Sequence, residues 1–177
     1  MSEEKLELAK EIFWRYNGLF FHMDREGEYE KYKSFDISKN QERAWREERR
    51  DELFEKLSIE KNKSVLSSLF FRLEDITKDL GDQTGIEKMF LFAWNNCEQF
   101  DTFTTLLLVE RVVDIVTFVE CEDKFKRKIL RDCSEMLKKA LKKPILVSMD
   151  YEEDFYEPMT EERVRDRINV LIRQCSE

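Results

Sequence analysis

The sequence predicts an all-α fold, and three observations carry this prediction. Charged residues make up 40% of the 177-residue chain and apolar residues 41%, a balance typical of helices that bury one stripe and expose the rest. Only 4 Gly and 2 Pro are present, too few for the turns that a sheet protein needs. Apolar residues also recur three or four positions apart, which is the helical period. We therefore expect a single all-α domain over residues 1–177.

About seven helices are expected from this spacing and from residues that favour helix ends. Ser38 with Gln41 resembles a capping box, Asn17-Gly18 and Gly81 are C-terminal stops, and Thr160 is an N-cap. The predicted helices cover 3–16, 39–57, 64–80, 85–100, 102–120, 122–142 and a last segment that follows residue 160. The stretch from Leu19 to Phe35 receives no assignment.

The helix over 102–120 is expected at the centre of the domain, because it is apolar nearly all round. Short links among the helices between residues 64 and 142 force consecutive helices to lie antiparallel and adjacent. Two architectures remain open: a compact helical bundle, or a short stack of helix pairs.

A weak internal repeat bears on this choice. Arg72–Ile76 reappears 39 residues later as Arg111–Ile115, and at the same offset Ile86, Phe90 and Trp94 align with Phe125, Ile129 and Cys133. A period near 40 is typical of two-helix repeats, so the chain resembles HEAT and armadillo proteins in layout. The resemblance implies no functional residues, because no motif of those families is matched.

Charge and cysteine content limit the class of function. The net charge is −8 and the pI is near 5, which argues against general binding to nucleic-acid phosphates and suits a basic protein partner. The acidic N-terminus lacks the apolar core of a signal peptide, and no apolar run is long enough for a membrane span. We expect a cytoplasmic protein whose four cysteines are reduced thiols: Cys97, Cys121, Cys133 and Cys175.

The sequence lacks the residues that several common catalytic and cofactor sites require. His22 is the single histidine, so histidine-rich zinc sites and di-iron centres lack ligands, and we expect His22 to be structural or exposed. The four glycines stand apart at positions 18, 27, 81 and 85, so no phosphate-binding loop can form. We therefore expect neither a catalytic residue nor a bound metal or cofactor, and a non-enzymatic function is favoured.

One pair of carboxylates offers an alternative. Glu110 and Asp114 lie one turn apart on the most apolar helix, which suits a Mg²⁺-dependent helical hydrolase. The plainer interpretation is that Arg111 pairs with Asp114 while Glu110 faces solvent.

The distribution of charge gives the candidate partner sites. Residues 124–143 hold nine bases against two acids, and residues 150–162 hold seven acids and no base. Three aromatic residues alternate with five acids in the segment before the last helix, a composition suited to binding a basic partner. The candidate partner-binding residues are Asp150, Tyr151, Glu152, Glu153, Asp154, Phe155, Tyr156 and Glu157.

Two further segments are rich in basic residues. The basic helix 124–143 offers nucleic-acid binding as a further alternative. The arginines at 43, 46, 49 and 50 surround Trp45 but alternate with acids, so ion pairs on an exposed face are expected there.

The sequence thus predicts a non-enzymatic, cytoplasmic protein-interaction domain whose acidic surface binds a basic protein. A neutralising protein of the immunity or antitoxin type has this small, acidic profile. The oligomeric state stays open.

Overall fold

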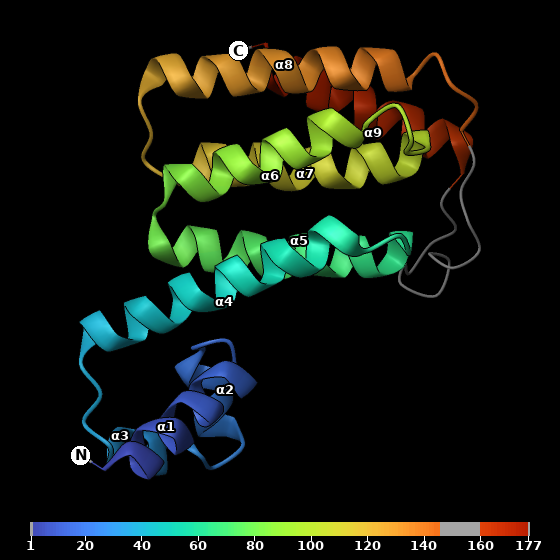
Figure 1. Cartoon of the computed structure of the whole chain (residues 1–177). Helices are drawn as coiled ribbons and strands as arrows, with labels where there is room; N and C mark the ends of the chain where they lie inside the picture. Colours follow the sequence, from blue (N-terminus) through green and yellow to red (C-terminus); the bar gives the residue numbers. More distant parts are fainter. Residues whose placement is uncertain (1, 146–159, 177) are drawn as a thin grey trace. The chain divides into compact units, whose positions relative to one another are not determined.

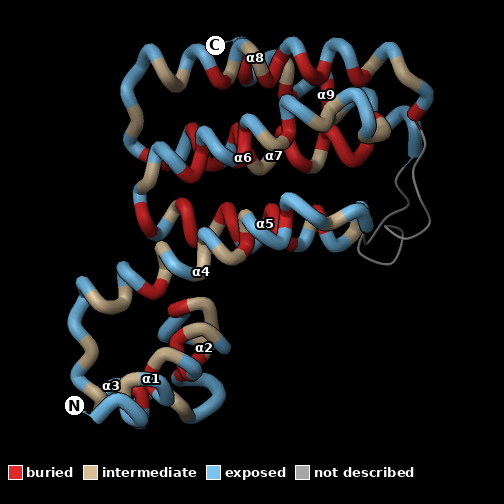
Figure 2. Tube along the Cα trace, in the orientation of Figure 1, coloured by how far each residue is buried: buried red, intermediate tan, exposed pale blue. Residues whose placement is uncertain are grey.

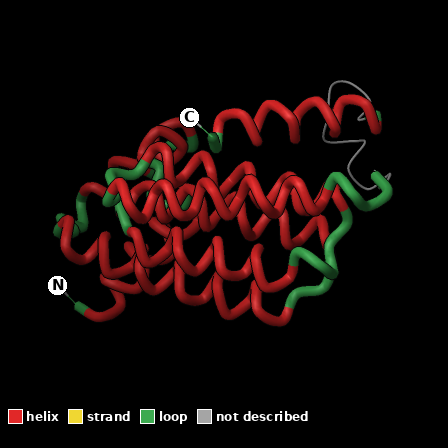
Figure 3. Tube along the Cα trace, turned by 90° about the horizontal axis from the view of Figure 1, so that it is seen from above, coloured by secondary structure: helices red, strands yellow, loops and turns green. Residues whose placement is uncertain are grey.

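The computed structural model describes residues 2–145 and 160–176 and confirms the all-α fold. These residues form nine helices and no strand (Figures 1 and 3). Within the same residues, no helix combines the length and apolar character that crossing a membrane requires. The helices are α1 (Glu3–Arg15), α2 (Phe20–Arg25), α3 (Tyr29–Lys33), α4 (Lys39–Ile59), α5 (Lys63–Leu80), α6 (Gln83–Asn96), α7 (Thr102–Phe118), α8 (Asp123–Ala140) and α9 (Glu161–Gln174).

The predicted helix ends are largely those observed, because local residues set them. Ser38 Oγ accepts a hydrogen bond from the backbone N–H of Gln41 at 3.2 Å, and Gly81 ends α5 in the left-handed conformation with φ of 61°. Asn17 and Gly18 also have positive φ where α1 ends. The helix predicted over 85–100 is shifted, since Asp82 accepts from the N–H of Thr84 at 2.9 Å and starts α6 earlier. The unassigned stretch contains the short helices α2 and α3.

The chain divides into two compact units, Met1–Glu55 and Lys56–Glu177, and α4 continues from one into the other. The expectation of a single domain stays a prediction. In the first unit an aromatic cluster forms the core. The ring of Phe13 lies 5.9 Å from that of Tyr32 and 5.5 Å from that of Trp45. Tyr32 donates its hydroxyl hydrogen bond to Glu42 at 2.7 Å, so the one polar atom of this buried ring is satisfied.

The second unit is built around α7, as the sequence predicts. Helices α5, α7 and α9 form a row with α7 in the middle, while α6 contacts α5 and α7, and α8 contacts α7 and α9. Figure 2 shows the burial of α7, and most of its residues are inaccessible to solvent. Phe118, the last residue of α7, is an exception at 71% exposure. Each hairpin therefore packs on the next, which is the layout expected from stacked helix pairs.

The 39-residue repeat coincides with equivalent positions in α5 and α7. Asn62 caps α5 and Asp101 caps α7, each through a side-chain oxygen, and these residues are 39 positions apart. Buried positions of the two helices also match at this offset, for example Leu73 with Val112 and Ile76 with Ile115. Burial agrees less well between the equivalent positions of α6 and α8, since Trp94 is 36% exposed and its equivalent Cys133 is buried.

Candidate functional site

The sequence placed its candidate partner site at Asp150–Glu157, and these residues lie outside the part of the chain that the structure describes. The described residues form candidate surfaces of their own. These are a groove on α1, a groove between α7 and α9, and a groove at the start of α8.

Glu110 and Asp114 do line a common groove, but the local pairing predicted around them is wrong. Glu110 accepts from Arg167 of α9, with Nη2 2.6 Å from Oε2 and Nε 3.1 Å from Oε1. Arg111 donates to Glu74 of α5 at 3.0 Å instead of pairing with Asp114. The reason is burial: Glu74 is only 3% exposed, and a buried carboxylate requires a close cation. The row of α5, α7 and α9 supplies these cations from neighbouring helices.

This arrangement weakens the Mg²⁺-dependent alternative. The groove has a volume of about 470 Å³ and is lined by Asp114, Asp166 and Val170 besides the Glu110–Arg167 pair. Burial raises the pKa of Glu110, and the charge of Arg167 opposes this rise. A divalent cation would have to displace the guanidinium from both carboxylate oxygens. The described residues hold no cluster of three His, Cys, Asp or Glu side chains suited to a metal ion.

His22 is half-buried on α2, and the four arginines of α4 lie in ion pairs. The His22 ring lies edge-on to Phe21, with ring centroids 5.7 Å apart. Each of the four arginines has a carboxylate partner, and Trp45 beside them is 3% exposed. The pairs are Arg43–Glu47 (3.1 Å), Arg46–Glu42 (3.9 Å), Arg49–Glu52 (2.8 Å) and Arg50–Asp51 (3.1 Å). The predicted ion pairs are therefore present, but the face is not the exposed one expected, because Arg46, Arg49 and Arg50 are half-buried.

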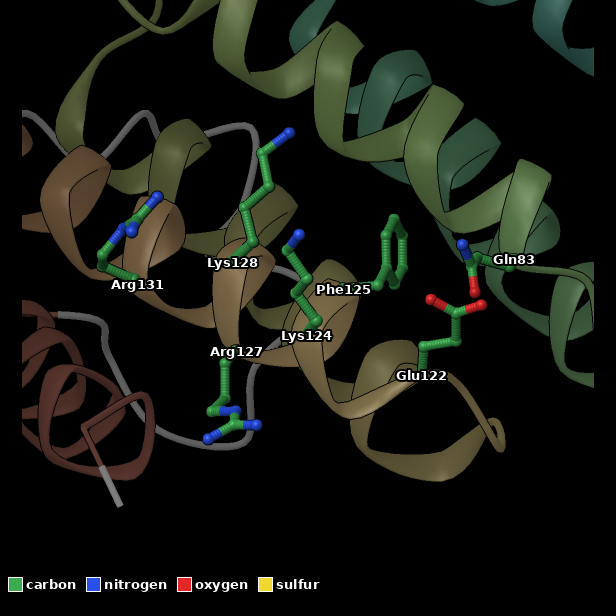
Figure 4. Close-up of a pocket in the computed structure, with 7 residues that line it drawn as sticks. All are labelled: Gln83, Glu122, Lys124, Phe125, Arg127, Lys128 and Arg131. Carbon is green, nitrogen blue, oxygen red and sulfur yellow. The ribbon is translucent and has the colours of Figure 1, made fainter.

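A groove at the start of α8 collects basic side chains. Four exposed cations line it, together with the half-buried ring of Phe125, the exposed carboxylate of Glu122 and the amide of Gln83 from α6 (Figure 4). In that view Lys124 and Lys128 extend to the same side of α8 as Phe125, while Arg127 extends to the other side. The four cations are Lys124, Arg127, Lys128 and Arg131.

A groove on α1 collects acidic side chains, and sequence reasoning did not single it out. Glu4, Glu7 and Glu11 line it with Leu8, Lys10 and Trp14. Lys10 Nζ pairs with Glu48 at 2.7 Å and lies 4.4 Å from the Trp14 ring centroid. The signal was present, since the three glutamates recur at helical spacing opposite the buried stripe of α1.

Comparison of the chain with protein-family models, with curated proteins and with solved structures finds no significant match.

Proposed function

We propose that this chain is a non-enzymatic protein-interaction domain whose acidic surface binds a basic protein partner. The acidic groove on α1 is the observation that carries the proposal. Its three glutamates, Glu4, Glu7 and Glu11, are exposed and line the groove together with the apolar side chains of Leu8 and Trp14. Apolar surface beside exposed charges is suited to binding a protein. Burial of the apolar surface contributes binding energy, and the charges attract an oppositely charged partner.

The groove is suited to cations for a second reason. Two basic side chains already lie against the Trp14 ring: Lys10 Nζ at 4.4 Å and Arg49 Cζ at 5.4 Å from its centroid. An indole face attracts cations through its quadrupole. Because Glu48 neutralises Lys10, the lining stays negative overall. A lysine or arginine of the partner would meet the exposed carboxylates of Glu4, Glu7 and Glu11.

The finer form of the proposal is a cytoplasmic neutralising protein of the immunity or antitoxin type. Its support is the net charge of −8 on a small chain. A basic toxin would associate rapidly with such a surface, because opposite charges accelerate encounter at low salt.

The test is quantitative affinity purification from the native host, followed by calorimetry with the basic protein recovered. The triple variant Glu4→Gln, Glu7→Gln, Glu11→Gln removes the three negative charges of the groove and leaves the solvent exposure of α1 unchanged. We expect its affinity to fall at least tenfold, with a weaker dependence on salt. A second variant, with Asp150, Glu153 and Asp154 made amides and Phe155→Ala, tests the segment that the sequence singled out.

A matched control removes three other exposed acids: Asp24→Asn, Glu30→Gln and Glu87→Gln. It changes the net charge equally and should bind as the unmodified protein does. Loss of affinity only in the 150–155 variant would place the site in that segment and exclude the α1 groove. Equal loss in the control, or recovery of acidic partners alone, would contradict the proposal.

A further inference from the structure

The basic groove at the start of α8 is distinct from the acidic surface proposed above. Lys124, Arg127, Lys128 and Arg131 are all exposed, and the groove has a volume of about 620 Å³. Their positions lie opposite the face of α8 that buries Ile129 and Cys133, and Arg127 extends away from the side that carries Phe125 (Figure 4).

The charges of this groove are poorly compensated, in contrast with those of α4. Within the described residues, Lys124 and Lys128 form no ion pair, and Arg127 donates to the backbone carbonyl of Asp123 at 3.3 Å. Arg131 contacts Asp132 at 3.0 Å but keeps 71% of its side chain exposed. Every arginine of the α4 patch has a carboxylate partner. Glu122 is the one acid among the described residues that line the groove, so the four cations leave a net positive surface for an anion.

The arrangement of the cations favours an anion whose charges repeat along its length. Positions 124, 128 and 131 lie one turn apart, so their Cα atoms advance by about 5 Å each along the helix. Single-stranded nucleic acids carry one phosphate per nucleotide, and their binding sites combine such a cationic track with aromatic rings for base stacking. Phe125 supplies a ring in the groove, and Gln83, whose amide lies beside the Glu122 carboxylate (Figure 4), supplies a group that can donate to or accept from a base edge.

We infer that the α8 groove binds a short stretch of single-stranded nucleic acid without strong sequence preference. Duplexes fit less well, because paired and stacked bases offer no free face to Phe125. The net charge of −8 opposes long-range approach of a polyanion. Binding therefore depends on close contacts in the groove, at the non-specific level with Kd of about 10⁻⁴–10⁻⁶ M.

The experiment measures fluorescence anisotropy of a labelled oligothymidylate of about 12 nucleotides, with salt raised from about 20 mM. Four phosphate contacts predict a slope of log K against log salt near −3, at about −0.7 per contact. The variant Lys124→Gln, Lys128→Gln, Arg131→Gln should bind at least tenfold more weakly, with a slope reduced by about 2. Phe125→Leu should weaken binding by loss of stacking while the slope stays unchanged.

A control variant, Arg43→Gln, Lys138→Gln and Arg165→Gln, removes three exposed cations that are paired elsewhere. It should bind the oligonucleotide within about twofold of the unmodified protein. Circular dichroism checks that all variants remain helical. Absence of binding at low salt, or equal weakening by the control, would overturn the inference. Competition by polyglutamate as strong as that by unlabelled oligonucleotide would overturn it too, and would assign the groove to an acidic protein.

Discussion

Gly85 shows how one missing side chain sets the distance between two helices. A Cβ atom at this position would lie 2.7 Å from Thr77 Cγ2 and 2.8 Å from Thr77 Oγ1. Thr77 is completely buried on α5, and its hydroxyl has no hydrogen-bond partner among the described residues. Gly85 is itself buried in the first turns of α6. The glycine thus permits close packing between α5 and α6.

The substitution Gly85→Ala should lower the free energy of unfolding by about 1–3 kcal/mol, because the new methyl group overpacks a rigid site. Urea unfolding followed by circular dichroism measures this change. In the double variant with Thr77→Ala the clashing atoms are gone, so the Gly85→Ala step should cost much less. A full cost in that background would show that packing against Thr77 is not the cause.

The four cysteines differ in their expected reactivity. Cys133 and Cys175 are buried, and burial raises the pKa of both thiols, that of Cys175 to about 11. Because the thiolate is the reactive form, both should resist a thiol reagent at pH 8 in the folded protein. Mass spectrometry after labelling should find modification at Cys97 before Cys133, and at Cys133 only after denaturant is added. Rapid labelling of native Cys133 would contradict the packing of α8.

The N-terminus of α7 is capped by one residue, Asp101. Asp101 Oδ1 accepts from the backbone N–H of Thr104 at 2.7 Å, and Oδ2 contacts Lys63 Nζ at 2.5 Å. Burial by itself would raise the pKa of Asp101, but the hydrogen bonds from Lys63 and Thr104 outweigh burial and lower the pKa. Asn62 caps α5 in the same way with an amide that does not titrate.

The stability contributed by these two capping residues should depend differently on pH. Asp101→Asn removes the carboxylate charge, and Asp101→Ala also removes the cap, at about 1 kcal/mol. Since the pKa of Asp101 is lowered on folding, its carboxylate stabilises the protein above the unfolded pKa of about 3.9, and this stability is lost as the pH falls through the folded pKa. The stability difference between the unmodified protein and Asp101→Asn should therefore shrink between pH 5 and pH 3.

The matched control for this measurement is Asn62→Ala. Its destabilisation should be the same at pH 5 and pH 3, because no titrating group is removed. Urea unfolding at both pH values supplies the comparison. A constant difference for Asp101→Asn would show that the charge of this cap contributes nothing.

Local elements of this structure could be predicted because their causes lie within a few residues. Ser38, Gly81 and Asn17-Gly18 mark helix ends through their own backbone geometry, so periodicity and caps located the long helices. The ion pairs could not be predicted in this way. Glu110 binds Arg167, 57 residues away, while the sequence offers Asp114 as a nearer partner for Arg111. Only the packing of the helix row decides between these partners.

The candidate surfaces were predictable to a similar extent. The excess of lysine and arginine in 124–143 indicated a basic face, and the structure adds Gln83 from another helix. The acidic groove on α1 was missed, although the helical spacing of Glu4, Glu7 and Glu11 was visible, because exposed acids are ordinary on the solvated face of a helix. A charge pattern alone does not distinguish solvation of a helix from recognition of a partner.

For the whole molecule, three tryptophans test whether the chain unfolds as one domain. Trp14 and Trp45 lie in the unit Met1–Glu55 and Trp94 lies in the other, so the variant Trp94→Phe confines the fluorescence signal to the first unit. The change is mild, because Trp94 is 36% exposed and a phenylalanine ring keeps the packing against Phe90, whose centroid is 5.7 Å away.

We expect fluorescence and far-ultraviolet circular dichroism of this variant to give the same urea midpoint. The physical reason is α4, a continuous helix over Lys39–Ile59 that belongs to both units. Unfolding either unit breaks part of this helix, and helix formation is cooperative, so loss of one unit weakens the other. A fluorescence midpoint well separated from the circular dichroism midpoint would contradict the single-domain prediction, since each unit would then unfold by itself.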